Sequence, residues 1–300
     1  MGPAQLLKST VKNFYPVKLM LEQRKINAQY SKEISLLNGK HKSENLHPSI
    51  LFFTLHKCAS VYVKDLLFEL AEDVGMTPIN LGGYLWKSAK SPKELAEQLK
   101  SAFKPTGYLY GPFRETSLLP QMQDLGGYRL IDNLDSYKIL LMLRDPRDVL
   151  TSKYFSMAYS HYVPELQKEK MLAKREEALK MTIDEFVTSR SQMNEFLKKY
   201  GEYSQELMDR PNILFVKYED MVNNFETWLN SVIKFLELDV SQEKINKIVS
   251  EADFSVDKED IHSHKRQVTP GDHQRKLKPE TIEILNSEFG EILDKFGYAR

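Results

Sequence analysis

The chain has 300 residues, and its 42 Lys and Arg residues balance its 42 Asp and Glu residues, so the formal net charge at pH 7 is zero. This balance excludes a global electrostatic attraction to nucleic acid or to an anionic membrane, so any anion site must be local. A single cysteine, Cys58, excludes an internal disulfide and a cysteine-rich metal site.

The length suits one large α/β domain or two small ones. The apolar runs are far shorter than the roughly 20 residues that a membrane-spanning helix needs. The first residues, MGPAQLLKST, lack the compact apolar region and small-residue cleavage site of a signal peptide. With a lone cysteine, which fits a reducing compartment, these features predict a cytoplasmic protein without a membrane span.

The N-terminal part, residues 1–48, is charged and helix-prone, and we expect a helical extension there, followed by one domain over residues 49–300. Short apolar runs in this domain predict buried strands, and longer amphipathic patterns between them predict helices. Such alternation favours a single α/β domain with a central, mostly parallel sheet that is flanked by helices, with ligands binding beyond the C-terminal strand ends. The expected strands are Ile50–Thr54, Gly107–Tyr110, Tyr137–Leu143 and Asn212–Tyr218, and two of the expected helices are Val61–Val74 and Thr182–Tyr200.

The first strand runs into a loop and a helix start, His56–Tyr62. A tight turn there points backbone N–H groups and the positive end of the helix dipole into one concavity, and Lys57 adds a full positive charge. Ser60 can cap the helix or offer its hydroxyl to a phosphate oxygen. The spacing is not that of a Walker A loop, because the lysine precedes the turn residues. The plain alternative is an ordinary turn with an exposed lysine.

Cys58 lies near the start of this helix, where a thiol pKa can be lowered. We favour the alternative that Cys58 is a small residue filling a position in the turn, rather than a catalytic thiol.

The third expected strand ends in a second cationic loop, Arg144-Asp145-Pro146-Arg147-Asp148. Pro146 fits the first position of a helix, and Asp145 fits its N-cap. Arg144 then lies at the strand end, and Ser152 lies two turns into the helix. Arginine suits a phosphate monoester because its planar fork binds two oxygens at once. The plain alternative is a capped helix whose charges form surface pairs.

Together the two loops predict one anionic ligand held at two separated phosphates. A charge-dense segment further along, Lys168–Lys180, reads as a solvated helix, with a mobile lid over the substrate as the sharper alternative.

In these loops the sequence resembles sulfotransferases that use 3′-phosphoadenosine 5′-phosphosulfate (PAPS), whose fold is P-loop-NTPase-like. Their first motif, Lys-Ser-Gly-Thr-Thr-Trp, corresponds here to Lys57-Cys58-Ala59-Ser60-Val61-Tyr62, and their second motif corresponds to Arg144 through Ser152. The resemblance spans about residue 49 to the C-terminus. It also rests on VKYEDM (Val216–Met221), on HKRQVTPGD (His264–Asp272), which resembles the family's loop over the 3′-phosphate, and on Phe289 with Phe296-Gly297-Tyr298.

The resemblance implies PAPS as cofactor, with adenosine 3′,5′-bisphosphate as its product, and no metal. Lys57 would bind the phosphosulfate and shield the leaving phosphate, within a cradle that includes Cys58, Ala59, Ser60 and Val61. The remaining implied roles are 3′-phosphate binding by Arg144, Ser152, Lys265 and Arg266, and adenine contact by Tyr62, Tyr218 and Phe254.

Three positions depart from the family pattern. Ala59 replaces a glycine, so the turn must accommodate a Cβ. Val268 replaces the glycine in the late loop, and His273 stands where many members have tryptophan. The dimerisation pattern of many cytosolic members is not recognisable after Asp272, so the oligomeric state stays open.

The catalytic base is the least determined residue, because the histidine that many members carry after the second expected strand is absent. Sulfuryl transfer needs in-line positioning, stabilisation of negative charge and a base for the acceptor hydroxyl. Glu115 is the nearest titratable group, His161 comes next, and His56 is a third candidate.

The leading hypothesis is therefore a PAPS-dependent sulfotransferase acting on a hydroxyl of a small molecule or glycan. The alternatives are a P-loop-type kinase, since Leu140–Asp145 loosely resembles a Walker B strand, and a non-catalytic nucleotide-binding protein of the same fold. The acceptor pocket is expected in loops over residues 81–92, 111–119 and 159–180, whose aromatic residues favour a partly apolar acceptor.

Overall fold

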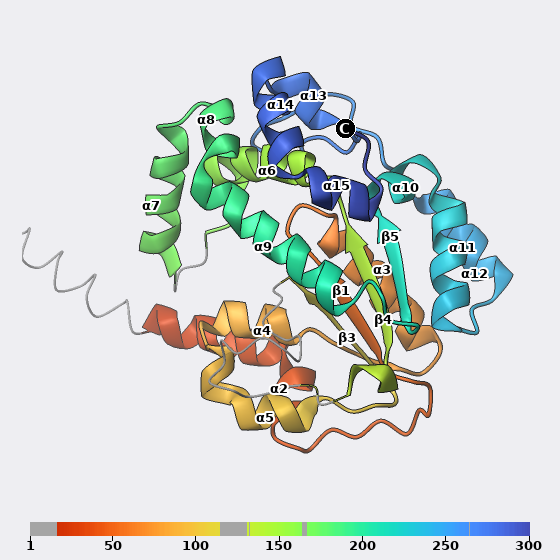
Figure 1. Cartoon of the computed structure of the whole chain (residues 1–300). Helices are drawn as coiled ribbons and strands as arrows, with labels where there is room; N and C mark the ends of the chain where they lie inside the picture. The colour runs from red at the N-terminus through yellow and green to blue at the C-terminus, as the bar shows by residue number, and fades with distance from the viewer. Residues whose placement is uncertain (1–16, 115–130, 132, 164–166, 264) are drawn as a thin grey trace, which may run out of the picture.

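The computed structural model describes residues 17–114, 131, 133–163, 167–263 and 265–300 (Figure 1). Within this part of the chain, five strands form one sheet in the order β2-β3-β1-β4-β5, and every neighbouring pair is parallel. The predicted α/β domain with a parallel central sheet is confirmed. The strands are β1 (Ile50–Thr54), β2 (Thr77–Ile79), β3 (Tyr108–Phe113), β4 (Lys138–Leu143) and β5 (Ile213–Lys217).

The order of the strands places a topological switch between β1 and β4. From β1 the chain builds β2 and β3 on one side, and it then crosses to add β4 and β5 on the other. In open parallel sheets, ligands bind in the crevice beyond the strand ends at such a point. Because Thr54 of β1 lies opposite Met142 of β4, the loops that follow these two strands begin side by side.

The central strands are apolar along their whole length because helices cover both faces of the sheet. Leu51 and Phe53 of β1 pack on the face covered by α9, whereas Phe52 packs on the face covered by α3 (Figure 1). Helix α3 buries residues at the i, i+3, i+4 spacing of an amphipathic helix, from Val63 to Ala71. The sheet is therefore held rigidly from both sides, which fixes the position of its C-terminal loops.

The N-terminal half contains a helix over residues 17–29. It is followed by α2 (Ser31–Leu37), α3 (Ser60–Asp73), α4 (Leu81–Ser88), the 3-10 turn η1 (Pro92–Leu95), α5 (Ala96–Ala102) and the 3-10 turn η4 (Leu134–Ser136). After β4 come α6 (Pro146–Phe155), the π-helical turn η5 (Ser156–Ser160), α7 (Lys168–Leu179), α8 (Ile183–Thr188) and α9 (Arg190–Glu206). After β5 come α10 (Tyr218–Asn223), α11 (Phe225–Leu236), α12 (Gln242–Glu251), α13 (Asp272–Lys276), α14 (Pro279–Glu288) and α15 (Gly290–Phe296).

The N-terminal helices pack directly on the domain. Ile26, Tyr30 and Leu36 belong to the same hydrophobic core as β1 and β3, and a carboxylate oxygen of Glu33 accepts a hydrogen bond of 2.8 Å from the backbone N–H of Asn80. The described part of the helical segment before residue 48 is thus anchored by apolar contacts and by a buried carboxylate.

Two predicted elements differ from the structure. The expected helix Thr182–Tyr200 is divided into α8 and α9 at Ser189, whose backbone is extended and whose hydroxyl donates to the carbonyl of Phe186 at 2.9 Å. A serine hydroxyl that bonds to the local backbone competes with continued helix formation. The second expected strand continues beyond Tyr110 to Phe113.

Among the described residues, no helix combines the length and the apolar character that crossing a membrane requires.

Candidate functional site

The two cationic loops meet at the switch point of the sheet. Arg144 follows β4, and its Nη1 donates to the backbone carbonyl of Lys57, which follows β1, at 3.3 Å. The structure therefore joins Lys57 and Arg144, 87 residues apart in the sequence, in one site.

The first loop turns sharply through two left-handed residues, Lys57 with φ 70° and Ala59 with φ 52°. Ala59 is the N-cap of α3 and has no side-chain cap, so the prediction that Ser60 caps this helix is wrong. The Ser60 hydroxyl instead accepts a hydrogen bond of 2.8 Å from Nε of Arg114. The described residues offer no acceptor to the N–H groups of Ser60, Val61 and Tyr62, as is usual in the first turn of a helix. This turn therefore presents free donors to an anion.

Lys57 is the cation of this loop, and no carboxylate among the described residues neutralises it. Its ammonium forms no ion pair with the residues that the structure describes. Burial and the nearby guanidinium groups of Arg144 and Arg266 lower the pKa of Lys57 to about 8. A partly buried ammonium without a carboxylate partner is characteristic of an anion site.

His56 precedes Lys57 in the first loop. Protein surrounds the ring on most sides, yet the residue stays exposed to solvent. Crowding, together with the charges of Arg114 and Lys199, lowers the pKa of His56 to about 3. His56 is therefore neutral at physiological pH.

Cys58 is buried completely beneath the loop and forms no disulfide. Burial raises the pKa of its thiol to about 12, so the thiol stays protonated at physiological pH. These properties support the packing role that we favoured for Cys58 over a catalytic thiol.

The second loop begins α6 as the sequence predicts. Asp145 is the N-cap, its side chain accepts from the backbone N–H of Arg147 at 2.9 Å, and Pro146 occupies the first helical position. Arg144 is almost fully buried, and its Nη2 lies 3.0 Å from Oδ2 of Asp148. The Asp148 carboxylate raises the pKa of Arg144 against the opposing effect of burial, so this guanidinium is permanently charged.

Asp148 connects this loop to a third segment, the turn before α13. Its carboxylate accepts hydrogen bonds from the backbone N–H groups of Gly271 (2.8 Å) and His273 (2.9 Å), and from Nδ1 of His273 (2.7 Å). With Arg144 it has four donors and no exposed surface. These donors hold the pKa of Asp148 well below its usual range, against the effect of burial.

Tyr218 and Arg266 flank Arg144. The guanidinium of Arg144 lies 4.3 Å from the ring centre of Tyr218, whose hydroxyl donates to the carbonyl of Val268 in the late loop. Arg266 stacks on Phe155 at 4.1 Å and pairs with Glu259 and Asp272.

Ser152 and Lys265 are less closely connected to this centre. Ser152 is partly exposed on α6, and its hydroxyl forms no hydrogen bond with the described residues. Lys265 lies in an exposed segment, where its ammonium contacts Asp253 at 3.3 Å.

Aromatic rings border the first loop on the α3 side. Tyr62 meets Phe254 edge to face at 5.3 Å and Phe225 at 6.1 Å. The residue Tyr62 is 37% exposed, so part of this aromatic surface is available for stacking. Val61 beside it is also exposed.

The structure describes two of the three candidates for the catalytic base, His161 and His56. Glu115 lies outside the described residues. His161 ends the π-helical turn η5 after α6, with Nδ1 3.4 Å from the Ser156 hydroxyl, and it lies near enough to His56 to affect its pKa. The structure therefore places His161 and Lys57 near enough to His56 for both of their charges to affect its pKa.

Sequence reasoning missed the roles of Asp148 and Arg114. Asp148 is part of the second loop, and an acidic residue four positions after Arg144 on a helix is a recognisable partner for it. Nothing in the sequence connects Arg114 with Ser60, because that contact depends on how β1 and β3 pair.

Comparison with known proteins identifies the family. The sequence profile described as "Sulfotransferase domain" matches residues 128–297, which include the second loop, Tyr218 and the late loop, but not Lys57. The chain belongs to this sulfotransferase domain family. The expected family membership is thereby confirmed, although the matched region begins later than residue 49.

Two curated relatives match parts of the chain. A mouse (Mus musculus) protein named "Sulfotransferase 1 family member D1" is 29% identical over 127 residues, which cover 41% of this chain and 38% of that protein. The "Amine sulfotransferase" of the rabbit (Oryctolagus cuniculus) is 30% identical over 117 residues, covering 39% of this chain and 35% of that protein. The matched segments thus span well under half the length of these relatives.

Solved structures with a similar chain course include mouse sulfotransferase SULT7A1 complexed with PAP, with a TM-score of 0.48, 16% identity, and coverage of 86% of this chain and 89% of that one. Retinol dehydratase in a complex with retinol and PAP gives a TM-score of 0.48 and 15% identity, covering 88% of this chain and 86% of that one.

The buried position of Asp148 generates a stability prediction. Replacing Asp148 by asparagine leaves the buried charge of Arg144 unpaired, and we expect the free energy of unfolding to fall by about 3–5 kcal/mol. The matched control is Asp135→Asn, which breaks an exposed ion pair with Arg210 and should cost about 1 kcal/mol or less. Urea unfolding of both variants measures the difference, and equal losses would show that Asp148 does not organise the site.

Proposed function

We propose that this protein is a PAPS-dependent sulfotransferase that moves a sulfuryl group to a hydroxyl of a small-molecule or glycan acceptor. The observation that carries this proposal is the position of Lys57. Its ammonium has no ion-pair partner among the described residues and lies beside the free N–H groups at the start of α3. Its backbone carbonyl accepts a hydrogen bond from the guanidinium of Arg144. Such a site fits a ligand with a reacting anionic group and a second, separate phosphate.

The residues present fit this donor. Nε of Arg144 is buried without a hydrogen-bond partner among the described residues, so the guanidinium keeps an unused donor. We propose that Arg144, with Ser152, Lys265 and Arg266, holds the 3′-phosphate, and that Tyr62, Tyr218 and Phe254 hold the adenine. Lys57 and the turn Cys58–Val61 would hold the 5′-phosphosulfate.

When bound, PAPS supplies a sulfuryl group attached to a phosphate leaving group. Lys57 and the helix N-terminus would stabilise the charge that develops on that phosphate, without a metal. Like phosphoryl transfer, sulfuryl transfer requires the protein to align the two reactants and to stabilise the negative charge of the transition state.

The acceptor class and the cellular compartment belong to the same proposal. Trp86 and Tyr162, whose rings lie 6.2 Å apart, are both exposed and supply aromatic surface for a partly apolar acceptor. A cytoplasmic location accords with Cys58 being a free thiol.

The donor assignment predicts that Lys57→Ala lowers sulfate transfer by about 10²–10³-fold, because one charge-stabilising donor is removed. Transfer is measured with ³⁵S-labelled PAPS and a panel of phenols, alcohols and saccharides. Lys234→Ala, an exposed lysine on α11, is the matched control and should transfer normally.

Full activity of Lys57→Ala would contradict this assignment. Binding of adenosine 3′,5′-bisphosphate without transfer to any acceptor would favour a non-catalytic protein of this fold. Tight binding of ATP with Mg²⁺, but not of the bisphosphate, would favour a kinase.

The lowered pKa of Lys57 predicts how nucleotide binding varies with pH. An anion binds the protonated ammonium, so affinity for adenosine 3′,5′-bisphosphate is greatest well below pH 8 and falls as the pH rises through 8, by about tenfold between pH 7 and 9. The phosphates of the ligand are already ionised in this range, since their second pKa is about 6. Lys57→Arg, which stays charged, should lack this fall, and calorimetric titration of both proteins measures it. An identical pH dependence in both would assign the titration to another group.

For the base we propose His161, since the low pKa of His56 makes that imidazole a weak proton acceptor. His161→Asn should lower kcat by about 10²–10⁴-fold and remove the acidic limb of its pH profile. His56→Asn should keep that limb. An acidic limb that survives in His161→Asn would point to another base, with Glu115 the next to test.

A further inference from the structure

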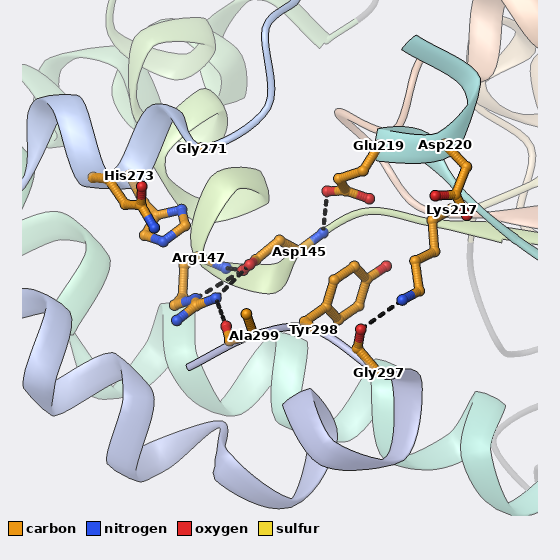
Figure 2. Close-up of a pocket in the computed structure, with 11 residues that line it drawn as sticks. Asp145, Arg147, Lys217, Glu219, Asp220, Gly271, His273, Gly297, Tyr298 and Ala299 are labelled. Atoms are coloured by element: carbon orange, nitrogen blue, oxygen red, sulfur yellow. Dashed lines mark hydrogen bonds and ion pairs between the residues drawn. The ribbon is translucent and has the colours of Figure 1, made fainter. Parts of the chain in front are cut away.

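A cavity lies beside Asp145, the residue that follows Arg144. Its volume is about 260 Å³, and it is lined by the starts of α6, α10 and α13 and by the C-terminal residues Gly297–Ala299 (Figure 2). We call it the tail pocket. One water molecule occupies roughly 30 Å³ in the liquid, so this volume has room for a small organic ligand.

Hydrogen bonds connect the residues that line the tail pocket. Nε of Arg147 donates to Asp145 at 3.0 Å, and its Nη2 donates to the carbonyl of Ala299. On the opposite side, Nζ of Lys217 donates to the carbonyl of Gly297 and lies 5.1 Å from the ring centre of Tyr298 (Figure 2). Arg147 is thus paired with a carboxylate, Lys217 is hydrogen-bonded to a carbonyl, and both side chains hold residues 297–299 in place.

Three buried polar atoms in the lining have no partner among the described residues. They are Oε2 of Glu219, the hydroxyl of Tyr298 and Nε2 of His273. Tyr298 and His273 are both more than nine-tenths buried. A buried polar atom without a partner costs about 1–3 kcal/mol, so three in one cavity point to a missing ligand.

Two of these atoms, Oε2 of Glu219 and Nε2 of His273, are acceptors that suit hydrogen-bond donors on a ligand, and the Tyr298 hydroxyl can accept as well as donate. Oε1 of Glu219 already accepts from the backbone N–H of Asp145 at 3.0 Å, which leaves Oε2 as an unused acceptor. Figure 2 shows the hydroxyl end of Tyr298 on the side of the pocket where Glu219 and Lys217 lie. Nδ1 of His273 donates to the ionised Asp148, so in the neutral ring Nε2 is an acceptor on the other side of Arg147.

Charge narrows the class of ligand. Burial raises the pKa of Glu219 to about 7 against the lowering effects of the Asp145 N–H and of Arg144, so a cation bound at Oε2 would stabilise the ionised carboxylate. Among the described residues, no group of three or more His, Cys, Asp or Glu side chains could hold a metal ion. An organic cation with N–H groups complements both the carboxylate and the unused acceptors.

We propose that the tail pocket binds a small primary amine in its ammonium form, whose N–H groups donate to Glu219 and Tyr298. This site is separate from the donor site and does not depend on the proposed sulfotransferase activity. Because Glu219 also holds the N–H of Asp145, next to Arg144, a bound ammonium stabilises the loop that carries Arg144.

The test uses the full-length protein and ethylammonium chloride as probe. Ethylammonium should raise the melting temperature in a saturable way and shift the ¹⁵N amide resonances of Asp145, Glu219 and Tyr298. Tetramethylammonium chloride, a cation without N–H donors, should do neither. Glu219→Gln keeps the size of the side chain and an acceptor for Asp145, and it should weaken ethylammonium binding by about tenfold or more, as loss of a charge-assisted bond does.

Three further variants test where ethylammonium binds. Tyr298→Phe should weaken binding by several-fold, whereas Glu280→Gln, an exposed position on α14, should leave it unchanged. Lys57→Ala should also bind ethylammonium normally, which separates this site from the donor site. Equal effects of the two cations, or unchanged ethylammonium binding in Glu219→Gln, would overturn the proposal and leave ordered water as the occupant.

Discussion

The carboxylate of Asp148 is the interaction on which the rest of the site depends. It lies in α6 without exposed surface and accepts hydrogen bonds from Arg144, from the backbone N–H groups of Gly271 and His273, and from the His273 ring. These donors come from the loop after β4 and from the start of α13, where Gly271 is 123 residues from Asp148 in the sequence. One buried acceptor thus fixes both the orientation of Arg144 and the place where the late loop returns to the sheet.

The positions of these loops follow from the sheet, and much of that could be predicted from the sequence. Runs such as Ile50–Thr54 are apolar throughout because both faces of the strand are covered, and four of the five strands were predicted from that signal. The missed strand, Thr77–Ile79, has three residues and contains a proline, which is tolerated here because β2 is an edge strand. The Asp145 cap was predicted because its signal is local, whereas the Ser60 cap was wrong because Arg114, from a different strand, claims that hydroxyl.

The cations of the site differ in what they can do for a ligand. Arg144 and Arg266 are already paired, with Asp148 and with Glu259 and Asp272, so an incoming phosphate must share them with carboxylates. Lys57 has no such competitor among the described residues, and its pKa is lowered by burial and by the nearby Arg144 and Arg266. The strongest gain on binding an anion is therefore at Lys57, where the reacting group is proposed to lie, while the paired arginines provide shape and selectivity. The sequence shows that all three residues are cations. It could not show which of them is paired, because that depends on which carboxylates the fold brings next to each one.

The two sides of the Arg144–Asp145 segment are coupled through consecutive residues of α10. Tyr218 packs its ring on the Arg144 guanidinium and bonds to Val268, on the side of the proposed nucleotide, while Glu219 holds the Asp145 N–H on the side of the tail pocket. Both side chains leave the same turn of α10, so we expect a ligand that fixes Glu219 to restrain the ring of Tyr218 as well. The proposed nucleotide site therefore rests in part on Glu219, whose carboxylate accepts from the N–H of the residue that follows Arg144.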